Sequence, residues 1–351
     1  MRIERLEVVP YALRFEAPYQ TARGRLEQRE LVLVRLHGGG LTGLGETASL
    51  SLRGGAPVTA IARELAEQGA ALVEGALVEA EGWRLLAGEL ASAHLSRQAR
   101  AALELALLDL AGKLAGQPAW RLLGAKAARP VECNATLVAG ETEAVVRDAL
   151  AWDERGFRTF KLKAGVDGDV DHVEGVRAAL GGDARLRVDA NGAWEVDEAV
   201  AKLRRMAPLE LAEQPVATLG EMAELRLRTG VALAADESVE SPQQARDAAA
   251  SCDATTVKLA KVGGPLAALE ISRWLPVYVS SALDGPVGIA AAAHVAQALP
   301  DAGLAHGLAT SLLFSEAIGS GAELDGPLLG VPDDPGLGVE IDERALERHR
   351  I

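Results

Sequence analysis

From about residue 130 onward, short apolar runs alternate with amphipathic helical stretches, and no other feature of the sequence limits the fold as strongly. Eight runs are candidate strands: 131–137, 158–164, 185–190, 209–214, 231–237, 254–260, 276–282 and 304–310. Helical patterns such as 141–156 and 195–206 lie between them. Strands joined by helical crossovers form parallel sheets. Eight such units predict a closed βα barrel rather than an open sheet.

The first 125 residues follow a different pattern. Residues 2–15 and 29–46 have strand character, and the triplet Gly38-Gly39-Gly40 predicts a hairpin turn within the second stretch. Residues 58–75 and 96–116 have helical periodicity. The tail from residue 326 is rich in Gly and Pro, and we expect it to pack back onto the first segment. The 351 residues therefore predict an α+β segment in front of the barrel.

Charge and composition exclude several classes of function. A net charge of −14 argues against a nucleic-acid or anionic-membrane binder, because such proteins carry basic faces. The sequence contains no apolar run of about 18 residues, so we expect no membrane span. The N-terminus is too charged for a signal peptide. Cys133 and Cys252 lie far apart and have no disulfide or metal spacing, so we expect a cytoplasmic protein. The expected partner is a small molecule.

Lysine is scarce in this chain, and its positions are informative. The chain has 36 Lys and Arg together, of which seven are Lys, and four of these lie at positions 161, 163, 258 and 261. Arg keeps its proton, whereas a buried or crowded Lys can lose it. These lysines are therefore candidate bases. Composition alone does not distinguish that interpretation from a chance pair of surface lysines on a strand.

Three carboxylates follow three successive predicted strands. Asp189, Glu213 and Asp236 lie near the carboxyl ends of 185–190, 209–214 and 231–237. In a βα barrel these ends meet at one face, where the chemistry of such proteins takes place. Three converging carboxylates repel one another unless a divalent cation binds between them, and an all-oxygen set suits Mg²⁺ or Mn²⁺ better than zinc. The sequence therefore predicts a metal site.

The lysines flank this predicted metal site. Lys161 and Lys163 are two residues apart on one strand, so both face the barrel interior, and Lys258 ends the strand 254–260. We expect burial and like charge to lower a lysine pKa, so that one lysine acts as a base near neutral pH. Such a site can remove a proton next to a carboxylate while the metal ion stabilises the enediolate intermediate.

These motifs resemble the muconate-lactonizing subgroup of the enolase superfamily along nearly the whole chain. They are "KLK" (161–163), "DANGAW" (189–194), "EQP" (213–215), "DES" (236–238) and "VKLAKVGG" (257–264). The resemblance implies a modified TIM barrel, (β/α)7β, over residues 126–325. It also implies an α+β capping domain over residues 1–125, completed by 326–351. A homo-oligomer is allowed as well, since relatives are often dimers or octamers.

The resemblance also assigns roles to the charged residues. It implies Asp189, Glu213 and Asp236 as Mg²⁺ ligands, with Mn²⁺ as the alternative metal. Lys163 and Lys258 become acid/base lysines on opposite faces of the substrate. Lys161 tunes Lys163 and touches the substrate carboxylate. Lys261 falls outside this set and is interpreted as structural.

Residues 279–300 look like the "SSALD…VG" signature of the o-succinylbenzoate synthases of menaquinone biosynthesis, and "HGLATSLLF" (306–314) fits the same group. Those enzymes dehydrate a succinyl-hydroxycyclohexadiene carboxylate. In this interpretation Lys163 removes the α-proton and returns it to the departing hydroxide, while Lys258 stays protonated. One departure is Gly285-Pro286, because a Pro removes an N–H donor that a substrate carboxylate could use.

Other residues are predicted to bind substrate on weaker grounds. Strand ends contribute four of them and the segment 17–30, where this subgroup has a specificity loop, contributes two: Asn191, Ser280, Ser281, Asp284, Tyr19 and Arg23.

Four alternative functions remain open. They are an N-succinylamino-acid racemase, a dipeptide epimerase, a muconate-type cycloisomerase and a non-catalytic barrel that only binds. The segment 309–321 lacks the Asp-x-Asp pair of dipeptide epimerases, and Asp284 stands where muconate cycloisomerases usually have Glu. The intact lysines argue against a non-catalytic protein.

Overall fold

The computed structural model describes residues 1–21, 24–51 and 54–351. Its first part, which we call the cap (residues 1–125), opens with an antiparallel sheet of β1 (Arg5–Thr21), β2 (Gly24–Gly38) and β3 (Leu41–Ala48). Gly39 and Gly40 join β2 to β3 with φ angles of 53° and 77°. Positive φ at both central residues is what a tight hairpin turn requires. The predicted hairpin is therefore confirmed.

Helices cover one face of this sheet. They are α1 (Val58–Glu64), α2 (Ala70–Val73), α3 (Trp83–Ser92), α4 (Arg97–Ala115) and α5 (Ala119–Leu123). The Ser96 side chain accepts a hydrogen bond from the N–H of Ala99 and begins α4, and Gly116 ends it in the left-handed conformation. β3 lies so close to α4 that a Cβ on Gly45 would be 1.9 Å from the carbonyl oxygen of Ala102. Glycine at that position lets the helix and the sheet touch.

The second part, which we call the barrel (residues 126–325), is built on a seven-stranded sheet with the order β11-β10-β9-β8-β7-β6-β5. Each neighbouring pair is parallel. The strands are β5 (Ala135–Leu137), β6 (Thr159–Lys163), β7 (Arg185–Asp189), β8 (Leu211–Glu213), β9 (Leu233–Ala235), β10 (Ala254–Val257) and β11 (Val277–Val279).

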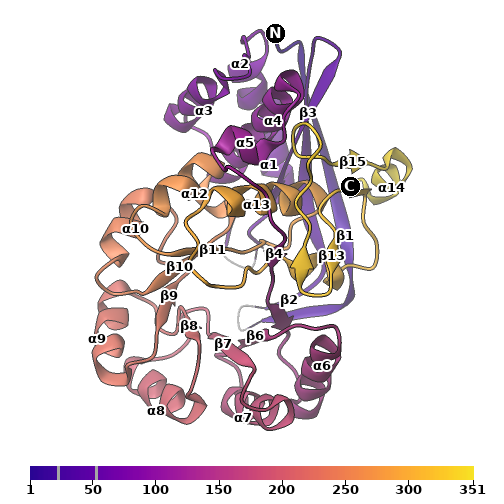
Figure 1. Ribbon diagram of the computed structural model, residues 1–351. Helices are drawn as coiled ribbons and strands as arrows, with labels where there is room; N and C mark the ends of the chain where they lie inside the picture. Colours follow the sequence, from indigo (N-terminus) through magenta and orange to yellow (C-terminus); the bar gives the residue numbers. More distant parts are fainter. Residues whose placement is uncertain (22–23, 52–53) are drawn as a thin grey trace.

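Helices connect successive strands and lie outside the curved sheet in Figure 1. They are α6 (Thr142–Glu154), α7 (Asp169–Leu180), α8 (Val196–Met206), α9 (Leu219–Thr229), α10 (Pro242–Ala248), α11 (Leu259–Val262), α12 (Pro265–Ile271) and α13 (Pro286–Ala298). The alternation predicted from the sequence is confirmed, and the fold is the mixed α/β barrel that it indicated.

The prediction of an eighth strand over residues 304–310 is wrong. Only His306 and Gly307 form bridges, to Cys133 before β5 and to Ser280 after β11. A short 3₁₀ helix (Ala309–Leu313) begins directly afterwards. Because Cys133 and Ser280 lie at the two edges of the sheet, this two-residue contact still connects the edges. A longer strand was not needed to close the barrel.

The tail packs on the first segment, as expected, where the N–H of Leu337 donates to Asp109 Oδ1 at 2.7 Å, and it also pairs with strands of the barrel. β14 (Leu328–Leu329) pairs with β4 (Val131–Glu132) and with β13 (Leu324–Asp325), and β15 (Glu340–Ile341) pairs with β12 (Gly319–Ser320). The last helix, α14 (Glu343–His349), lies beside β1 in Figure 1. Arg35 of β2 holds it, donating to both carboxylate oxygens of Glu343 at 2.7 and 2.8 Å.

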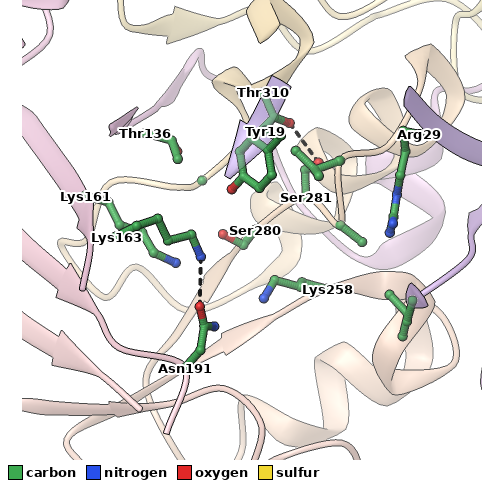
Figure 2. Close-up of a pocket in the computed structure, with 14 residues that line it drawn as sticks. Tyr19, Arg29, Thr136, Lys161, Lys163, Asn191, Lys258, Ser280, Ser281 and Thr310 are labelled. Atoms are coloured by element: carbon green, nitrogen blue, oxygen red, sulfur yellow. Dashed lines mark hydrogen bonds between the residues drawn. The ribbon is translucent and has the colours of Figure 1, made fainter. Parts of the chain in front are cut away.

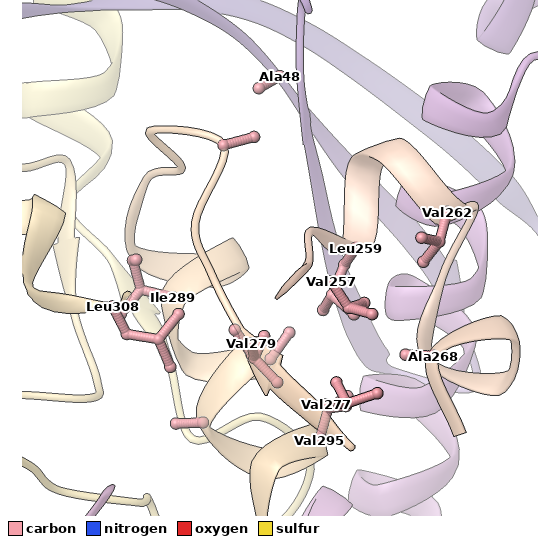
Figure 3. Packing of buried hydrophobic residues seen from close by; sticks show 14 of the residues in the cluster. Ala48, Val257, Leu259, Val262, Ala268, Val277, Val279, Ile289, Val295 and Leu308 are labelled. Carbon is pink, nitrogen blue, oxygen red and sulfur yellow. The ribbon is translucent and has the colours of Figure 1, made fainter. Parts of the chain in front are cut away.

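One continuous apolar core runs through both parts of the protein. Figure 3 shows Ala48 of the cap in the same cluster as Val257 and Val279 of the barrel. The face of the cap is thereby fixed against the carboxyl ends of the barrel strands. Among the described helices, none is both long and apolar enough to span a membrane.

Candidate active site

A pocket lies where the cap meets the carboxyl ends of the barrel strands. It encloses about 740 Å³ of atom-free space, including the part open to solvent. Figure 2 shows the side chains that line it. They are Tyr19, Arg29, Leu50, Thr136, Lys161, Lys163, Asn191, Lys258, Ser280, Ser281, Ala282, Leu283, Gly307 and Thr310. The three predicted catalytic lysines therefore line one pocket.

Strand register places the β6 lysines beside two of the predicted carboxylates. Lys163 is opposite Asp189 in the β6–β7 pair, and Asp189 is opposite Glu213 in the β7–β8 pair. The Nζ of Lys161 donates to Glu213 Oε2 at 2.6 Å and lies 2.9 Å from Asp189 Oδ2. The Nζ of Lys163 donates to Asp189 Oδ2 at 2.6 Å and to Asn191 Oδ1 at 3.4 Å.

The third carboxylate binds the lysines that follow β10. Asp236 comes directly after β9, and its Oδ2 accepts from Lys258 Nζ at 2.6 Å. Lys261 Nζ donates to Asp236 Oδ1 at 2.7 Å and to the Asp236 carbonyl oxygen at 2.5 Å. Lys261 is buried and is not part of the pocket lining. These contacts are compatible with the structural role assigned to Lys261.

The ion pairs reverse the expected pKa of the β6 lysines. Burial lowers the pKa of Lys163, but the attraction of Asp189 and further interactions outweigh it, and the net pKa is raised. The pKa of Lys161 is also raised, because Asp189, Glu213 and Asp236 together outweigh its burial. Conversely, Lys161 and Lys163 hold the pKa of Asp189 below its usual range despite its burial. The prediction of a lowered lysine pKa is wrong for Lys161 and Lys163 in this structure, because the carboxylates lie within ion-pair distance.

The three carboxylates fit a hard divalent cation in their chemistry. All three are completely buried, and within the described part of the chain Glu213 Oε1 has no hydrogen-bond partner. A buried carboxylate oxygen without a partner is costly unless a cation or a donor binds there. As they stand, no three acidic, histidine or cysteine side chains among the described residues are arranged to hold a metal ion. The lysine ammonium groups provide the positive charge that these carboxylates need.

The predicted substrate-binding residues divide into three groups. Tyr19, Asn191, Ser280 and Ser281 line the pocket. Arg23 lies outside the described residues. Asp284 does not line the pocket. Its Oδ2 accepts from the N–H of Ala282 at 3.0 Å, and its own N–H donates to Ser281 Oγ at 2.9 Å. Asp284 therefore folds back on its own loop, and its placement does not support substrate contact.

Sequence reasoning missed several residues of the pocket wall. Thr310 donates through its hydroxyl to Ser281 Oγ at 2.8 Å, which fixes that serine (Figure 2). Thr136 stands between two apolar residues of β5, and a single polar residue in such a strand was a signal for the barrel interior. Arg29 enters from β2, where residues 31–34 are buried on both faces. The alternation of apolar and polar residues along β2 therefore did not indicate which face of the strand the Arg29 side chain lies on.

A buried glutamate joins the cap to the loop that carries the two serines. Glu46 of β3 accepts hydrogen bonds from the N–H groups of Gly285 at 2.7 Å and Gly288 at 3.2 Å, and from the hydroxyl of Tyr11 at 2.8 Å. A Cβ on Gly285 would be 2.3 Å from the Tyr11 hydroxyl oxygen. Burial and the nearby charge of Asp284 raise the pKa of Glu46 to about 7.

This contact explains the Gly285-Pro286 departure. The cap approaches so closely that residue 285 has no room for a side chain, and the N–H of Gly285 points at Glu46 rather than at a substrate. Pro286 is the first residue of α13, where its missing N–H costs nothing. The two residues thus belong to the interface between cap and barrel.

Two family profiles match this sequence. Residues 4–124 match the mandelate racemase/muconate lactonizing enzyme N-terminal domain. Residues 144–345 match the enolase C-terminal domain-like family.

Individual proteins are similar over most of the length. The o-succinylbenzoate synthase of Thermobifida fusca (strain YX) is 41% identical over 63% of this chain and 71% of its own. Muconate cycloisomerase 1-1 of Acinetobacter lwoffii is 31% identical over 99% of this chain and 96% of its own.

Solved structures superpose closely as well. The muconate lactonizing enzyme of Pseudomonas fluorescens, complexed with muconolactone, superposes with a TM-score of 0.94 at 30% identity, covering 100% of this chain and 99% of the other. The dipeptide epimerase of Enterococcus faecalis V583, complexed with Mg and the dipeptide L-Leu-L-Tyr, gives 0.91 at 26% identity, covering 97% and 100%.

Proposed function

Because the chain belongs to the mandelate racemase/muconate lactonizing enzyme family of the enolase superfamily, we propose that it removes a proton next to a substrate carboxylate and acts as an o-succinylbenzoate synthase. Membership makes it an enzyme, since its relatives in this superfamily are enzymes. The finer assignment of substrate is the proposal.

One observation carries the reaction type. Lys163 and Lys258 both line the pocket, yet each is ion-paired to a different buried carboxylate, Asp189 and Asp236. They also come from β6 and from the end of β10, which are not neighbours in the sheet. Two lysines that reach one pocket from separate strands can act on two sides of a bound molecule. That arrangement suits removal of a proton by one lysine and charge stabilisation by the other.

For a cyclohexadiene carboxylate that bears a succinyl group and a hydroxyl group, the step is a dehydration. Lys163 Nζ takes the proton from the carbon next to the carboxylate, which breaks the C–H bond. It then gives that proton to the departing hydroxyl on the same face, so that the C–O bond breaks, water leaves and the ring becomes aromatic. Lys258, still protonated, stabilises the negative charge that develops on the carboxylate.

Asp189, Glu213 and Asp236 are the residues that would hold Mg²⁺ or Mn²⁺. When bound, a divalent cation supplies positive charge to the substrate carboxylate and competes with the lysines for the charge of these three side chains. Competition between the cation and Lys163 for Asp189 affects whether Lys163 can act as a base. A lysine whose pKa is raised by an aspartate is a poor base until that attraction weakens.

Similarity supports dehydration over the other reactions of the family. The o-succinylbenzoate synthase of T. fusca is 41% identical, against 31% for the muconate cycloisomerase of A. lwoffii, although the first comparison spans less of the chain. The pocket wall formed by Ser280, Ser281 and Thr310 provides small hydroxyl donors rather than a carboxylate. Such a wall suits an anionic group better than the ammonium group of a dipeptide.

The test is a turnover assay with the succinyl-hydroxycyclohexadiene carboxylate and Mg²⁺, followed by loss of the diene absorbance. We expect EDTA-sensitive turnover, and a fall of about a hundredfold or more in kcat for Lys163→Ala. Lys202→Ala is the matched control, because Lys202 is also paired to a barrel aspartate, Asp169, at 2.9 Å but does not line the pocket. Absence of turnover by folded, Mg²⁺-loaded protein refutes the assignment.

Muconate cycloisomerisation is the second candidate. It is favoured by similarity to a muconate cycloisomerase over 99% of the chain and by the superposition on the muconolactone complex. The same protein sample is therefore offered cis,cis-muconate, an N-succinylamino acid and a dipeptide. The substrate with the highest kcat/KM identifies the reaction.

A further inference from the structure

The cap contributes three described side chains to the pocket wall, and one of them is charged. They are Tyr19, Arg29 and Leu50. We propose that Arg29 binds a second carboxylate of the substrate, at the end of the pocket away from the β6 lysines. Arg29 would then be the residue on which binding of the second carboxylate depends. This inference rests on the proposed function, because it concerns the far end of the molecule whose first carboxylate lies at the lysines.

Separation within the pocket is the first support. Figure 2 shows Arg29 on the opposite side of the pocket from Lys161 and Lys163, with Ser280 and Tyr19 between them. The lysines and their carboxylates come from the barrel, whereas Arg29 belongs to β2 of the cap. A molecule that fills the pocket therefore meets two separate groups of positive charge.

Burial and chemistry indicate what kind of group Arg29 meets. The residue is only 3% exposed, although it lines a pocket. A guanidinium group keeps its charge in such surroundings, and its planar fork matches the two oxygens of a carboxylate. Leu50, Ala282 and Leu283 provide apolar surface on the same wall. Apolar surface beside two cationic ends fits a hydrocarbon or ring spacer with an acid group at each end.

Asp284, which does not line the pocket, interacts electrostatically with Arg29. Burial raises the pKa of Asp284, and the positive charge of Arg29 acts in the opposite direction. The carboxylate of Asp284 also accepts the N–H of Ala282 at 3.0 Å, so it is fixed to the serine loop. Arg29 is thereby attracted toward the loop that carries Ser281. The ammonium group of a dipeptide would be repelled at this end.

The experiment compares ligands that differ by one carboxylate. o-Succinylbenzoate is paired with 2-butanoylbenzoate, and cis,cis-muconate is paired with (2Z,4Z)-hexa-2,4-dienoate, each titrated by calorimetry into protein with Mg²⁺. We expect at least one dicarboxylate to bind on the order of ten- to a hundredfold more tightly than its monocarboxylate partner, as loss of a charge-assisted hydrogen-bonded pair implies.

Arg29→Gln should abolish that preference while leaving monocarboxylate affinity unchanged. Arg35→Gln is the matched control, since Arg35 lies on the same strand and pairs with Glu343 away from the pocket. It should keep the preference. A folded Arg29→Gln protein that still prefers the dicarboxylate overturns the inference. So does a wild-type protein that shows no preference in either pair, which tests the inference even if the variant fails to fold.

The two proposals fail separately. Turnover of the diene together with an Arg29-independent preference leaves the synthase assignment standing and removes the role of Arg29. Absence of diene turnover together with an Arg29-dependent preference for muconate removes the synthase assignment and keeps the second carboxylate site.

Discussion

Replacing Glu46 by Gln should make the stability of this protein less dependent on pH. Glu46 is buried between cap and barrel and accepts the N–H groups of Gly285 and Gly288 and the Tyr11 hydroxyl. A Gln side chain has nearly the same shape, and its carbonyl oxygen can still accept the two N–H groups. It cannot ionise, so the variant removes the titration of residue 46 while keeping the contact between cap and loop.

The magnitude follows from the pKa of Glu46. Burial and Asp284 raise it from an ordinary 4.5 to about 7 in the folded protein. Between these pH values the folded state keeps a proton that the unfolded state has lost. This contribution to stability is therefore fully present below pH 4.5 and is lost as the pH rises through 7. The shift corresponds to a total of about 3 kcal/mol, of which about 2 kcal/mol falls between pH 5.5 and 8.5.

Urea unfolding at several pH values between 5.5 and 8.5 measures this effect. The free energy of unfolding of the wild type minus that of Glu46→Gln should decrease by about 2 kcal/mol across the range. Glu104→Gln provides an independent case. Glu104 is also buried, it accepts the N–H of Leu266 at 2.6 Å, and burial raises its pKa to about 7. Glu89→Gln, at an exposed position of α3, is the control and should leave the pH dependence unchanged.

A constant difference between wild type and Glu46→Gln across this range would refute the reasoning. It would mean that Glu46 is ionised throughout, so that the two N–H groups and the Tyr11 hydroxyl outweigh burial. The opposite sign, with the wild type gaining stability as the pH rises, would mean that the folded protein holds Glu46 ionised more strongly than water does.

Four further outcomes are expected. Gly288→Ala should lower the free energy of unfolding by about 1–3 kcal/mol, and with it the melting temperature, because the new Cβ would lie 2.7 Å from the Cβ of Asp284 and 2.8 Å from Glu46 Oε1. Ser281→Ala should raise KM several-fold with little change in kcat, since it removes the hydroxyl that positions Thr310 on the pocket wall. Lys258→Met should lower kcat by about a hundredfold or more while the protein stays folded, as judged by circular dichroism. EDTA should abolish turnover, and added Mg²⁺ should restore it, as followed by the diene absorbance.

The barrel was predictable because its signal repeats. Each strand is a short apolar run with a helix after it, and tertiary packing did not alter that pattern from β5 to β11. The last strand failed because its role is carried by His306 and Gly307 alone. A Cβ on Gly307 would be 2.1 Å from Ser280 Oγ, so the contact depends on close approach rather than on a run of strand residues. The periodicity of apolar residues in the sequence does not indicate where two backbone segments come this close.

The places of the candidate site residues were predictable from the sequence, but their partners were not. Strand ends located Lys163, Asp189 and Glu213, because register in a parallel sheet follows from the strands themselves. Arg29 on the pocket wall and Glu46 at the interface between cap and barrel were missed, since their neighbours lie in the other part of the protein. The sequence distances to their neighbours are long, and Gly285 lies 239 positions after Glu46. No local pattern spans such a distance.

The sign of the lysine pKa shows where residue patterns stop being sufficient. Burial, like charge and opposite charge are all present around Lys163, and the first two lower its pKa while the third raises it. Sequence indicates that all three exist, but their balance depends on separations of a few ångströms. The Nζ of Lys163 lies 2.6 Å from Asp189 Oδ2, and the attraction at that distance, together with further interactions, outweighs the effect of burial. We therefore expect Lys163 to act as a base only when Asp189 is engaged elsewhere, as it would be by the predicted metal ion.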